Sequence, residues 1–220
     1  MLKLYYANTD LVANEDVFHN LLNKMNEQRS RKVLRCKKEE DRRCSLLAGV
    51  LLRHALEEQG LVYEELEFSV TEQGKPLLAS LPELFFSLSH SGNRAVCLLS
   101  DKPIGVDIEN KNRPLLEKGR EERLMRVVGR SFHVQEYIEY MSASEEKRRE
   151  LFLKYWTRKE AVSKAEGKGL ALDFSKIEEP EEKFVSFWLD EDYYVSVYQE
   201  EELPPEEKLL LEEVTRVQFE

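Results

Sequence analysis

The segment FFSLSHSGNRAVCLLSDKPIGVDIE, residues 85–109, decides the fold. Its first part predicts a strand over 85–90, the Ser91-Gly92-Asn93 triplet is typical of a hairpin turn, and residues 94–99 predict the return strand. A second turn at Asp101-Lys102-Pro103 leads into a third strand over 104–109. An antiparallel hairpin followed at once by another strand predicts a sheet at the centre of the chain.

The sequence on both sides of this segment repeats one order of elements. Before it, we expect a strand at 2–6, helices at 16–28 and 41–59, and a short strand at 66–70 that leads to a turn at 74–76. After it, a charged helical region at 115–153 continues through Trp156 to Lys164 and ends at Gly167, and strands follow at 185–188 and 193–197. Helices followed by a hairpin, twice, predict an α+β protein of two similar α/β halves, residues 1–103 and 104–220.

Composition limits the class of protein. The 220 residues carry a formal net charge of −10 with 41% hydrophobic content, which indicates an acidic globular protein and argues against general nucleic-acid binding. No apolar run approaches the roughly 20 residues of a membrane span, and the first residues lack the pattern of a secretory signal. Cys36, Cys44 and Cys97 form no CxxC pair. We therefore expect a cytoplasmic protein with reduced thiols, no disulfide framework and no structural zinc.

Two carboxylates share one face of the strand at 104–109. Side chains alternate along a strand, so Asp107 and Glu109 lie on the same face, about 6.6 Å apart, where they are able to share a hard cation. Gly105 lies on that face too, and we expect its missing side chain to let a ligand approach. The alternative is an ordinary strand with its polar face in water.

A second group of polar residues lies on the helix that follows. Trp156, Glu160 and Lys164 are spaced four apart and share one face of the helix. They combine a base, a metal ligand and a cation for phosphate. The alternative is a surface Glu–Lys pair beside a core tryptophan.

The Phe86-Ser87-Leu88-Ser89-His90 stretch does not predict a serine hydrolase. Ser89 and His90 are neighbours on a strand, so their side chains diverge, and no G-x-S-x-G elbow is present. Hydroxyls and an imidazole at a strand end suit phosphate binding better. The carboxylates suit Mg²⁺, and the cationic side chains suit an anionic substrate, which together favour phosphoryl transfer. The cations are Arg43, Lys75, His90 and Lys164.

These motifs resemble the signatures of the 4′-phosphopantetheinyl transferases of the larger, surfactin-synthetase-activating type. The matching stretches are G-V-D-I-E at 105–109, W-x-x-K-E-A-x-x-K at 156–164, F-S-L-S-H at 86–90 and G-K-P at 74–76, and the resemblance covers roughly residues 30–175. It implies two halves in one chain that form a pseudo-dimer with the active site between them. It also implies transfer of the phosphopantetheine arm of coenzyme A to a serine of an apo acyl or peptidyl carrier protein, with release of 3′,5′-ADP.

The resemblance assigns roles residue by residue. It implies Mg²⁺ ligands at Asp107, Glu109 and Glu160, with Glu160 and Lys164 catalytic. It implies coenzyme A binding by a set of basic and polar residues: Arg31, Arg43, Lys75, Ser89, His90 and Lys164. The stretch that holds the 3′-phosphate in this family carries Gln28, Arg31, Lys32 and Arg35 here, which leaves open which of them contacts phosphate.

Two other functions stay open at this point: a different Mg²⁺-dependent phosphotransferase or nuclease, and a non-catalytic carrier-binding module. The chain is expected to be a monomer that binds neither nucleic acid nor membrane. Residues 111–130 carry seven basic and three acidic side chains, a net charge of +4 in an acidic protein. We expect this segment to dock an acidic carrier, with an apolar anchor formed by Leu115, Leu116, Leu124, Met125 and Val128.

Overall fold

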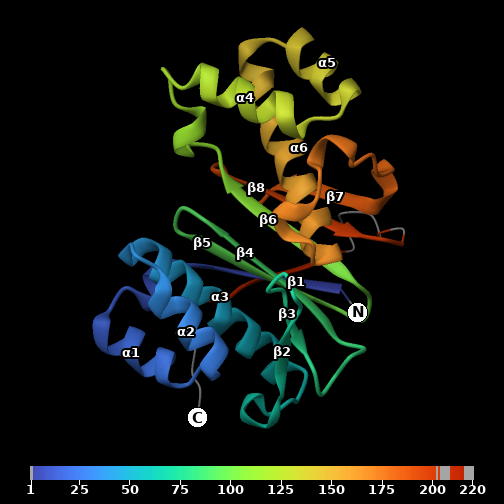
Figure 1. Ribbon diagram of the computed structural model, residues 1–220. Helices are drawn as coiled ribbons and strands as arrows, with labels where there is room; N and C mark the ends of the chain where they lie inside the picture. Colours follow the sequence, from blue (N-terminus) through green and yellow to red (C-terminus); the bar gives the residue numbers. More distant parts are fainter. Residues whose placement is uncertain (1, 202, 204–208, 216–220) are drawn as a thin grey trace.

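Two sheets lie at the centre of the molecule, and the first contains the predicted hairpin. The computed structural model describes residues 2–201, 203 and 209–215. Its four-stranded sheet has the order β4-β5-β1-β9 (Figure 1). The strands are β1 (Leu2–Asn8), β4 (Phe85–Ser91), β5 (Arg94–Ser100) and β9 (Leu210–Glu213). β5 is antiparallel to both β4 and β1, whereas β9 runs parallel to β1 at the edge. The strand β9 was not predicted from the sequence.

Three helices cover the outer face of this sheet: α1 (Glu15–Asn23), α2 (Glu27–Arg35) and α3 (Glu39–Glu58). The helix predicted at 16–28 is wrong in its extent, because α1 ends at Asn23 and a new helix begins at Glu27. The Asn26 side chain accepts a hydrogen bond from the backbone N–H of Arg29 at 2.9 Å and so caps α2. The predicted helix at 41–59 is confirmed as α3. A small hairpin of β2 (Phe68–Val70) and β3 (Pro76–Leu78) follows.

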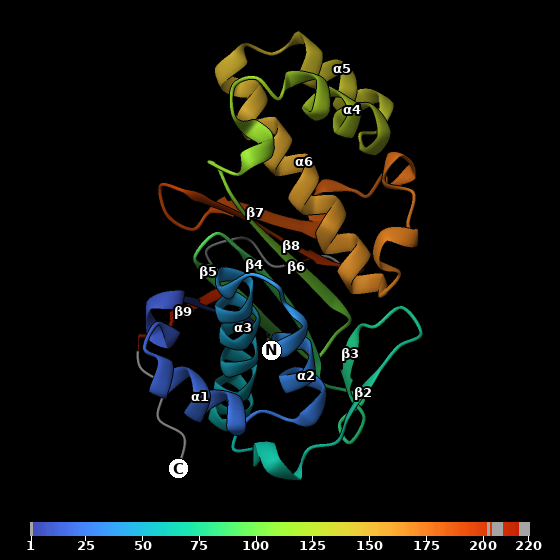
Figure 2. The same ribbon diagram turned by 60° about the vertical axis from the view of Figure 1, so that its left-hand side comes forward.

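The second sheet has the order β6-β8-β7 and is antiparallel throughout. Its strands are β6 (Ile104–Asn110), β7 (Phe184–Trp188) and β8 (Tyr193–Gln199). The long helix α6 (Glu145–Glu166) lies across β6 and β8. The helices α4 (Glu121–Ser131) and α5 (Val134–Ser142) lie beside its N-terminal half (Figure 2). The helical region predicted at 115–153 therefore contains α4, α5 and the first turns of α6.

The two halves follow the same connectivity. In each, a strand leads through helices to a hairpin whose second strand pairs with the first strand, giving the orders β4-β5-β1 and β7-β8-β6. One face of the first sheet packs on the α1–α3 layer, and its other face supplies Leu4, Val96 and Leu98 to a core shared with the second sheet. The layers therefore follow one another as helices, sheet, sheet, helix. The strand β9 comes from the second half of the chain but extends the sheet of the first half.

Serine hydroxyls join the facing edges of the two sheets. Three backbone N–H groups of β6 donate to three hydroxyls of β4. The pairs are Val106 to Ser87 at 3.0 Å, Ile108 to Ser89 at 3.4 Å and Asn110 to Ser91 at 3.1 Å. Side chains thus replace the backbone carbonyls that an ordinary sheet would use. In the described part of the chain, no helix is long and apolar enough to cross a bilayer.

Candidate active site

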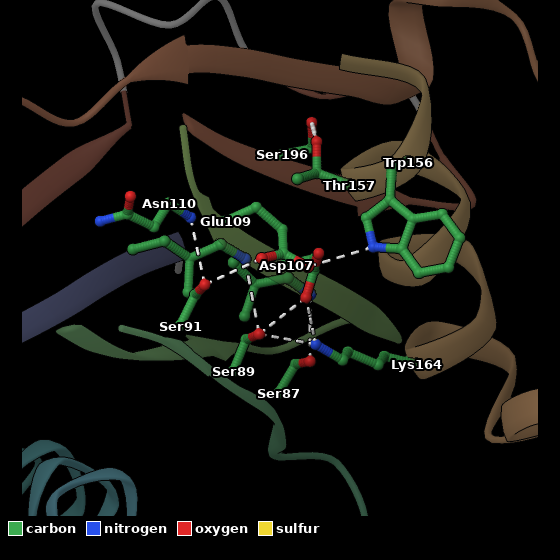
Figure 3. A network of polar contacts seen from close by, with 12 residues as sticks. Ser87, Ser89, Ser91, Asp107, Glu109, Asn110, Trp156, Thr157, Lys164 and Ser196 are labelled. Carbon is green, nitrogen blue, oxygen red and sulfur yellow. Dashed lines mark hydrogen bonds and ion pairs between the residues drawn. The ribbon is translucent and has the colours of Figure 1, made fainter. Parts of the chain in front are cut away.

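The helix α6 brings the three predicted residues of its polar face onto β6. The Trp156 indole N–H donates to Glu109 Oε1 at 3.2 Å, and the Lys164 ammonium pairs with Asp107 Oδ1 at 2.6 Å (Figure 3). Glu160 lies one turn from each of them on the same face. The residues of two separate sequence motifs therefore meet, as the periodicities of strand and helix predict.

Gly105 makes this contact possible, but not as expected. A Cβ atom at this position would lie 1.8 Å from the carbonyl oxygen of Ala161 and 2.8 Å from the backbone nitrogen of Ala165. The prediction that Gly105 lets a ligand approach is wrong, because the space is filled by the backbone of α6. The glycine instead allows the helix to pack directly on the strand.

Asp107 is the centre of the polar network. Its buried carboxylate accepts hydrogen bonds at Oδ1 from the Ser89 hydroxyl at 2.7 Å and from Lys164 at 2.6 Å, and Lys164 also donates to Ser89 at 2.7 Å. The other oxygen, Oδ2, is buried and has no hydrogen-bond partner among the residues that the structure describes. A buried carboxylate oxygen without a partner is costly, so this atom marks a place where a cationic or donor ligand would be stabilised.

Glu109 is held by donors from three elements. The Ser91 hydroxyl donates to Oε2 at 2.8 Å, while Trp156 and the Arg113 guanidinium donate to Oε1. Burial and the nearby charge of Asp107 together raise the pKa of Glu109 to about 7, against the opposing effect of Arg113. Ser91 and Arg113 were not identified from the sequence, although the four-residue spacing of Glu109 and Arg113 could have indicated the pair.

Glu160 is half-buried and forms no hydrogen bond or ion pair with any described residue. Burial and the nearby charge of Asp107 raise its pKa. Asp107 therefore repels both other carboxylates of the predicted metal site, and a cation would relieve that repulsion. Among the described residues, however, no three histidine, cysteine, aspartate or glutamate side chains are already arranged as a metal site.

A cavity of about 210 Å³ opens beside this network, between the two halves. Its wall includes side chains from α2, from the turn between β2 and β3, from β4 and from the end of α6. The polar lining residues are Arg29, Lys32, Gln73, Lys75, Ser87, Ser163 and Lys164. Burial lowers the pKa of Lys75 to about 8, and its ammonium donates to the carbonyl of Ala165 at 2.7 Å. Lys75 therefore joins the cavity wall of the first half to that of the second.

Arg29 is a buried cation without a carboxylate partner in the described part of the chain. The residue is 8% exposed, its side chain lies against Gly49 of α3, and its guanidinium makes one long hydrogen bond, 3.5 Å, to the carbonyl of Ser45. Burial lowers its pKa. Lys32 lies one turn further along α2 and lines the same cavity. The sequence reasoning missed Arg29, although its three-residue spacing from Lys32 places both on one face of the helix.

The other residues expected to bind coenzyme A lie in different surroundings. Arg31 is exposed on α2 and pairs with Glu27 at 2.5 Å, outside the cavity wall. Arg43 pairs with Glu39 and Glu15 and does not line the cavity. His90, at the end of β4, is exposed, yet partial desolvation lowers its pKa, and so do the surrounding cations Lys164, Lys32 and Arg29. Ser89 is occupied by the Asp107–Lys164 pair.

The comparisons with known proteins agree with this geometry. Residues 13–102 match the family described as "4′-phosphopantetheinyl transferase, N-terminal", and residues 103–210 match the 4′-phosphopantetheinyl transferase superfamily. Among curated proteins, the chain is 30% identical over 172 residues to the 4′-phosphopantetheinyl transferase Sfp of Bacillus subtilis, covering 78% of this chain and 73% of that protein.

Two further relatives carry the same description. The 4′-phosphopantetheinyl transferase ffp of Bacillus subtilis is 31% identical over 172 residues, covering 78% of this chain and 73% of the relative. The 4′-phosphopantetheinyl transferase HetI of a Nostoc species is 34% identical over 141 residues, covering 62% of this chain and 52% of the relative. The matched regions include β4, β6 and α6, which supply the polar network. The network of Ser89, Asp107 and Lys164 thus lies in an enzyme of the 4′-phosphopantetheinyl transferase superfamily, to which this chain belongs.

Proposed function

We propose that this enzyme transfers the 4′-phosphopantetheine arm of coenzyme A to a serine of an acyl or peptidyl carrier protein, in a Mg²⁺-dependent reaction that releases 3′,5′-ADP. The observation that carries the proposal is the Asp107–Lys164–Ser89 network at the edge of a basic cavity. It unites an acidic centre with cations from both halves. We also propose that the two halves form a pseudo-dimer within a monomer, because each half contributes one side of the site.

The residues present fit a magnesium ion. The unpartnered Oδ2 of Asp107 and the mutual repulsion of Asp107, Glu109 and Glu160 support cation binding among these three carboxylates. Oxygen ligands of this kind suit Mg²⁺, which keeps several waters and binds substrate phosphates as well. When bound, the ion would neutralise charge on the pyrophosphate of coenzyme A.

The cavity fits the anionic end of coenzyme A. Arg29 is buried and has no carboxylate partner among the described residues, so a phosphate would supply its counter-ion, and Lys32 and His90 add positive charge nearby. We therefore assign the 3′-phosphate to Arg29, Lys32 and His90. In this assignment Arg31, which does not line the cavity and pairs with Glu27, has no direct role.

The chemistry follows from Glu160 and Lys164. Glu160 has a raised pKa and no partner among the described residues, so it is suited to accept the proton of the carrier serine. The serine oxygen then forms a bond to the phosphorus that bears the pantetheine arm, and the bond from that phosphorus to the bridging oxygen of the pyrophosphate breaks. Lys164 is placed to stabilise negative charge on the transferred phosphate. The electron pair leaves with 3′,5′-ADP.

The two alternatives have less support. A different phosphotransferase or nuclease would not account for the family matches over both halves. A non-catalytic carrier-binding module would not need Glu160 or Lys164, and both are present in the network.

The test is incubation of an apo carrier protein with coenzyme A, Mg²⁺ and the enzyme, followed by mass spectrometry of the carrier. We expect a mass increase of one phosphopantetheine arm. Glu160→Gln keeps the shape of the side chain and is expected to slow transfer by about 10²-fold or more. Glu150→Gln, at an exposed position of the same helix, is the matched control. An unmodified carrier with the wild-type enzyme, or near-normal transfer by Glu160→Gln, would contradict the proposal.

A further inference from the structure

The guanidinium of Arg113 lies among the carboxylates of the candidate active site. It pairs with Glu109 Oε1 at 2.5 Å, and its charge opposes the rise in the pKa of Glu160 as well as that of Glu109. The Arg113 side chain is 22% exposed and the Glu109 side chain 15%, so solvent screens their attraction less than that of a surface pair. A cation of the chain itself therefore offsets part of the charge that a metal ion would offset.

Two stacked aromatic rings hold this guanidinium in place. The ring centroids of Phe152 and Trp156 are 5.9 Å apart, and Arg113 lies 5.8 Å from the first centroid and 5.3 Å from the second. A guanidinium is attracted to the face of an aromatic ring, so this packing favours one position of the side chain. The backbone N–H of Arg113 also donates to the carbonyl of Asn110 at 3.1 Å, which fixes the turn after β6. The turn and the rings together direct Arg113 toward Glu109.

This position differs from the expectation for residues 111–130. The sequence counted Arg113 among the charges that dock a carrier, but the structure pairs it with a carboxylate of the predicted metal site. The apolar anchor expected in the same segment is wrong. Val128 is fully buried, and the other four predicted anchor residues pack against the cluster around Phe132 and Phe152: Leu115, Leu116, Leu124 and Met125.

The three carboxylates differ in how much of their capacity to accept hydrogen bonds is used. Each oxygen of an ionised carboxylate accepts about two hydrogen bonds. Arg113 and Trp156 both donate to Glu109 Oε1 and so fill that oxygen. Asp107 Oδ2 and the Glu160 carboxylate, in contrast, accept no hydrogen bond from the described residues. A metal ion would therefore meet free oxygens at Asp107 and Glu160, whereas at Glu109 it would compete with Arg113.

We propose that Arg113 is a positioning residue that orients Glu109 and competes with Mg²⁺ for it, so that it sets how tightly the enzyme binds the ion. This inference rests on the proposed function and names the residue that regulates its metal site. When ionised, the three carboxylates carry three negative charges, and the ammonium of Lys164 and the guanidinium of Arg113 offset two of them. A divalent cation consequently binds against the positive charge of Arg113.

The experiment measures the Kd of Mn²⁺, from the electron paramagnetic resonance of the free ion, without coenzyme A or carrier. Arg113→Gln removes the charge, and Arg113→Lys keeps it. Arg120→Gln is the matched control, because Arg120 pairs with Glu117 on the surface outside the network. We expect Arg113→Gln to bind Mn²⁺ about five- to twentyfold more tightly than the wild type. Arg113→Lys and Arg120→Gln should stay within about twofold of the wild-type Kd.

Thermal unfolding gives a second readout with the opposite sign. In metal-free buffer Arg113→Gln leaves the repulsion among the carboxylates less compensated, so its Tm should fall by about 2–4 °C. Saturating Mg²⁺ should restore most of this loss, because the ion binds the folded state of the variant more tightly. A merely structural role of Arg113 would lower the Tm at every Mg²⁺ concentration and would not tighten metal binding.

The outcomes separate this inference from the proposed function. If the wild-type enzyme binds no Mn²⁺, the proposed metal site fails, and the inference fails with it. If the wild-type enzyme binds Mn²⁺ but Arg113→Gln binds it with the same or a lower affinity, only the role of Arg113 is overturned. Equal tightening by Arg113→Lys or by Arg120→Gln would also overturn it, because the effect would then not come from the charge beside Glu109.

Discussion

The sharpest consequence of the fold concerns Gly105→Ala. The added methyl group would lie 1.8 Å from the Ala161 carbonyl oxygen, and ordinary contact begins at 3.4 Å, so α6 must move away from β6 by about 1.6 Å. The obstacle is backbone and is not able to rotate aside. A shift of that size also stretches the 2.6 Å contact of Lys164 with Asp107 beyond hydrogen-bond range.

The expected magnitude has two parts. Overpacking of a buried position costs about 1–3 kcal/mol, and loss of the Lys164 contact leaves the buried Asp107 charge uncompensated, which costs more. We expect the free energy of unfolding to fall by at least about 3 kcal/mol, which lowers Tm by roughly 6–12 °C for a chain of this size. Transfer activity should fall as well, because α6 carries Glu160 and Lys164.

The measurement is urea unfolding with thermal unfolding, and Gly129→Ala is the matched control. Gly129 lies in α4, and no atom of the described residues lies within 4 Å of the position that a Cβ would take, so alanine there should stabilise the protein by about 0.5–1 kcal/mol. If Gly105→Ala unfolds at the same urea midpoint as the wild type and keeps its activity, the direct packing of α6 on β6 is refuted.

Three further predictions concern charged residues. In the enzyme without ligand, Lys75 has a pKa of about 8, and an anionic ligand favours its protonated form. The affinity for coenzyme A, measured by calorimetry, should therefore fall up to about tenfold between about pH 7 and about pH 9. Lys75→Gln should remove this pH dependence, and an unchanged pH dependence would exclude Lys75 from binding. His90→Ala should weaken coenzyme A more than dephospho-coenzyme A, by roughly 1.5–3 kcal/mol, and equal losses would exclude a contact with the 3′-phosphate. The Lys159 side chain is 1% exposed and pairs with Glu136 at 2.8 Å. Lys159→Met should therefore lower the free energy of unfolding in urea by about 3–5 kcal/mol. A decrease below about 1 kcal/mol would show that the buried charge is not essential for stability.

Local periodicity accounts for the part of the site that could be predicted. Alternation along β6 placed Asp107 and Glu109 on one face, and the helical period placed Trp156, Glu160 and Lys164 on one face; the structure confirms both arrangements. These regularities depend only on neighbours in the chain. The strand β9 escaped prediction because it has only four residues, and Leu210 and Leu211 at the sheet edge are exposed, which leaves no alternating pattern.

Arg29, the buried cation in the cavity wall, could not be predicted because its orientation depends on residues that are distant in the sequence. The predicted helix at 16–28 ended before Arg29, so the phase of α2 was unknown, and Arg31 was named as a binding residue while Arg29 was not. In the structure, the cap at Asn26 sets the phase and directs Arg29 toward α3, where the missing side chain of Gly49 makes room: a Cβ there would lie 2.9 Å from Arg29 Cγ. Two residues twenty positions apart therefore decide which arginine faces the cavity.

The serine hydroxyls of β4 explain why the candidate active site forms where β4 meets β6. Three hydroxyls of β4 each accept a hydrogen bond from a backbone N–H of β6: Ser87, Ser89 and Ser91. In addition, the Ser89 hydroxyl donates to Asp107 and the Ser91 hydroxyl donates to Glu109. The same hydroxyls therefore join the halves and orient the carboxylates. Because a buried polar group left unpaired is costly, any shift of one half against the other would break both sets of bonds together. Asp107 Oδ2, which has no hydrogen-bond partner among the described residues, is then held in a fixed position by a network that both halves must complete.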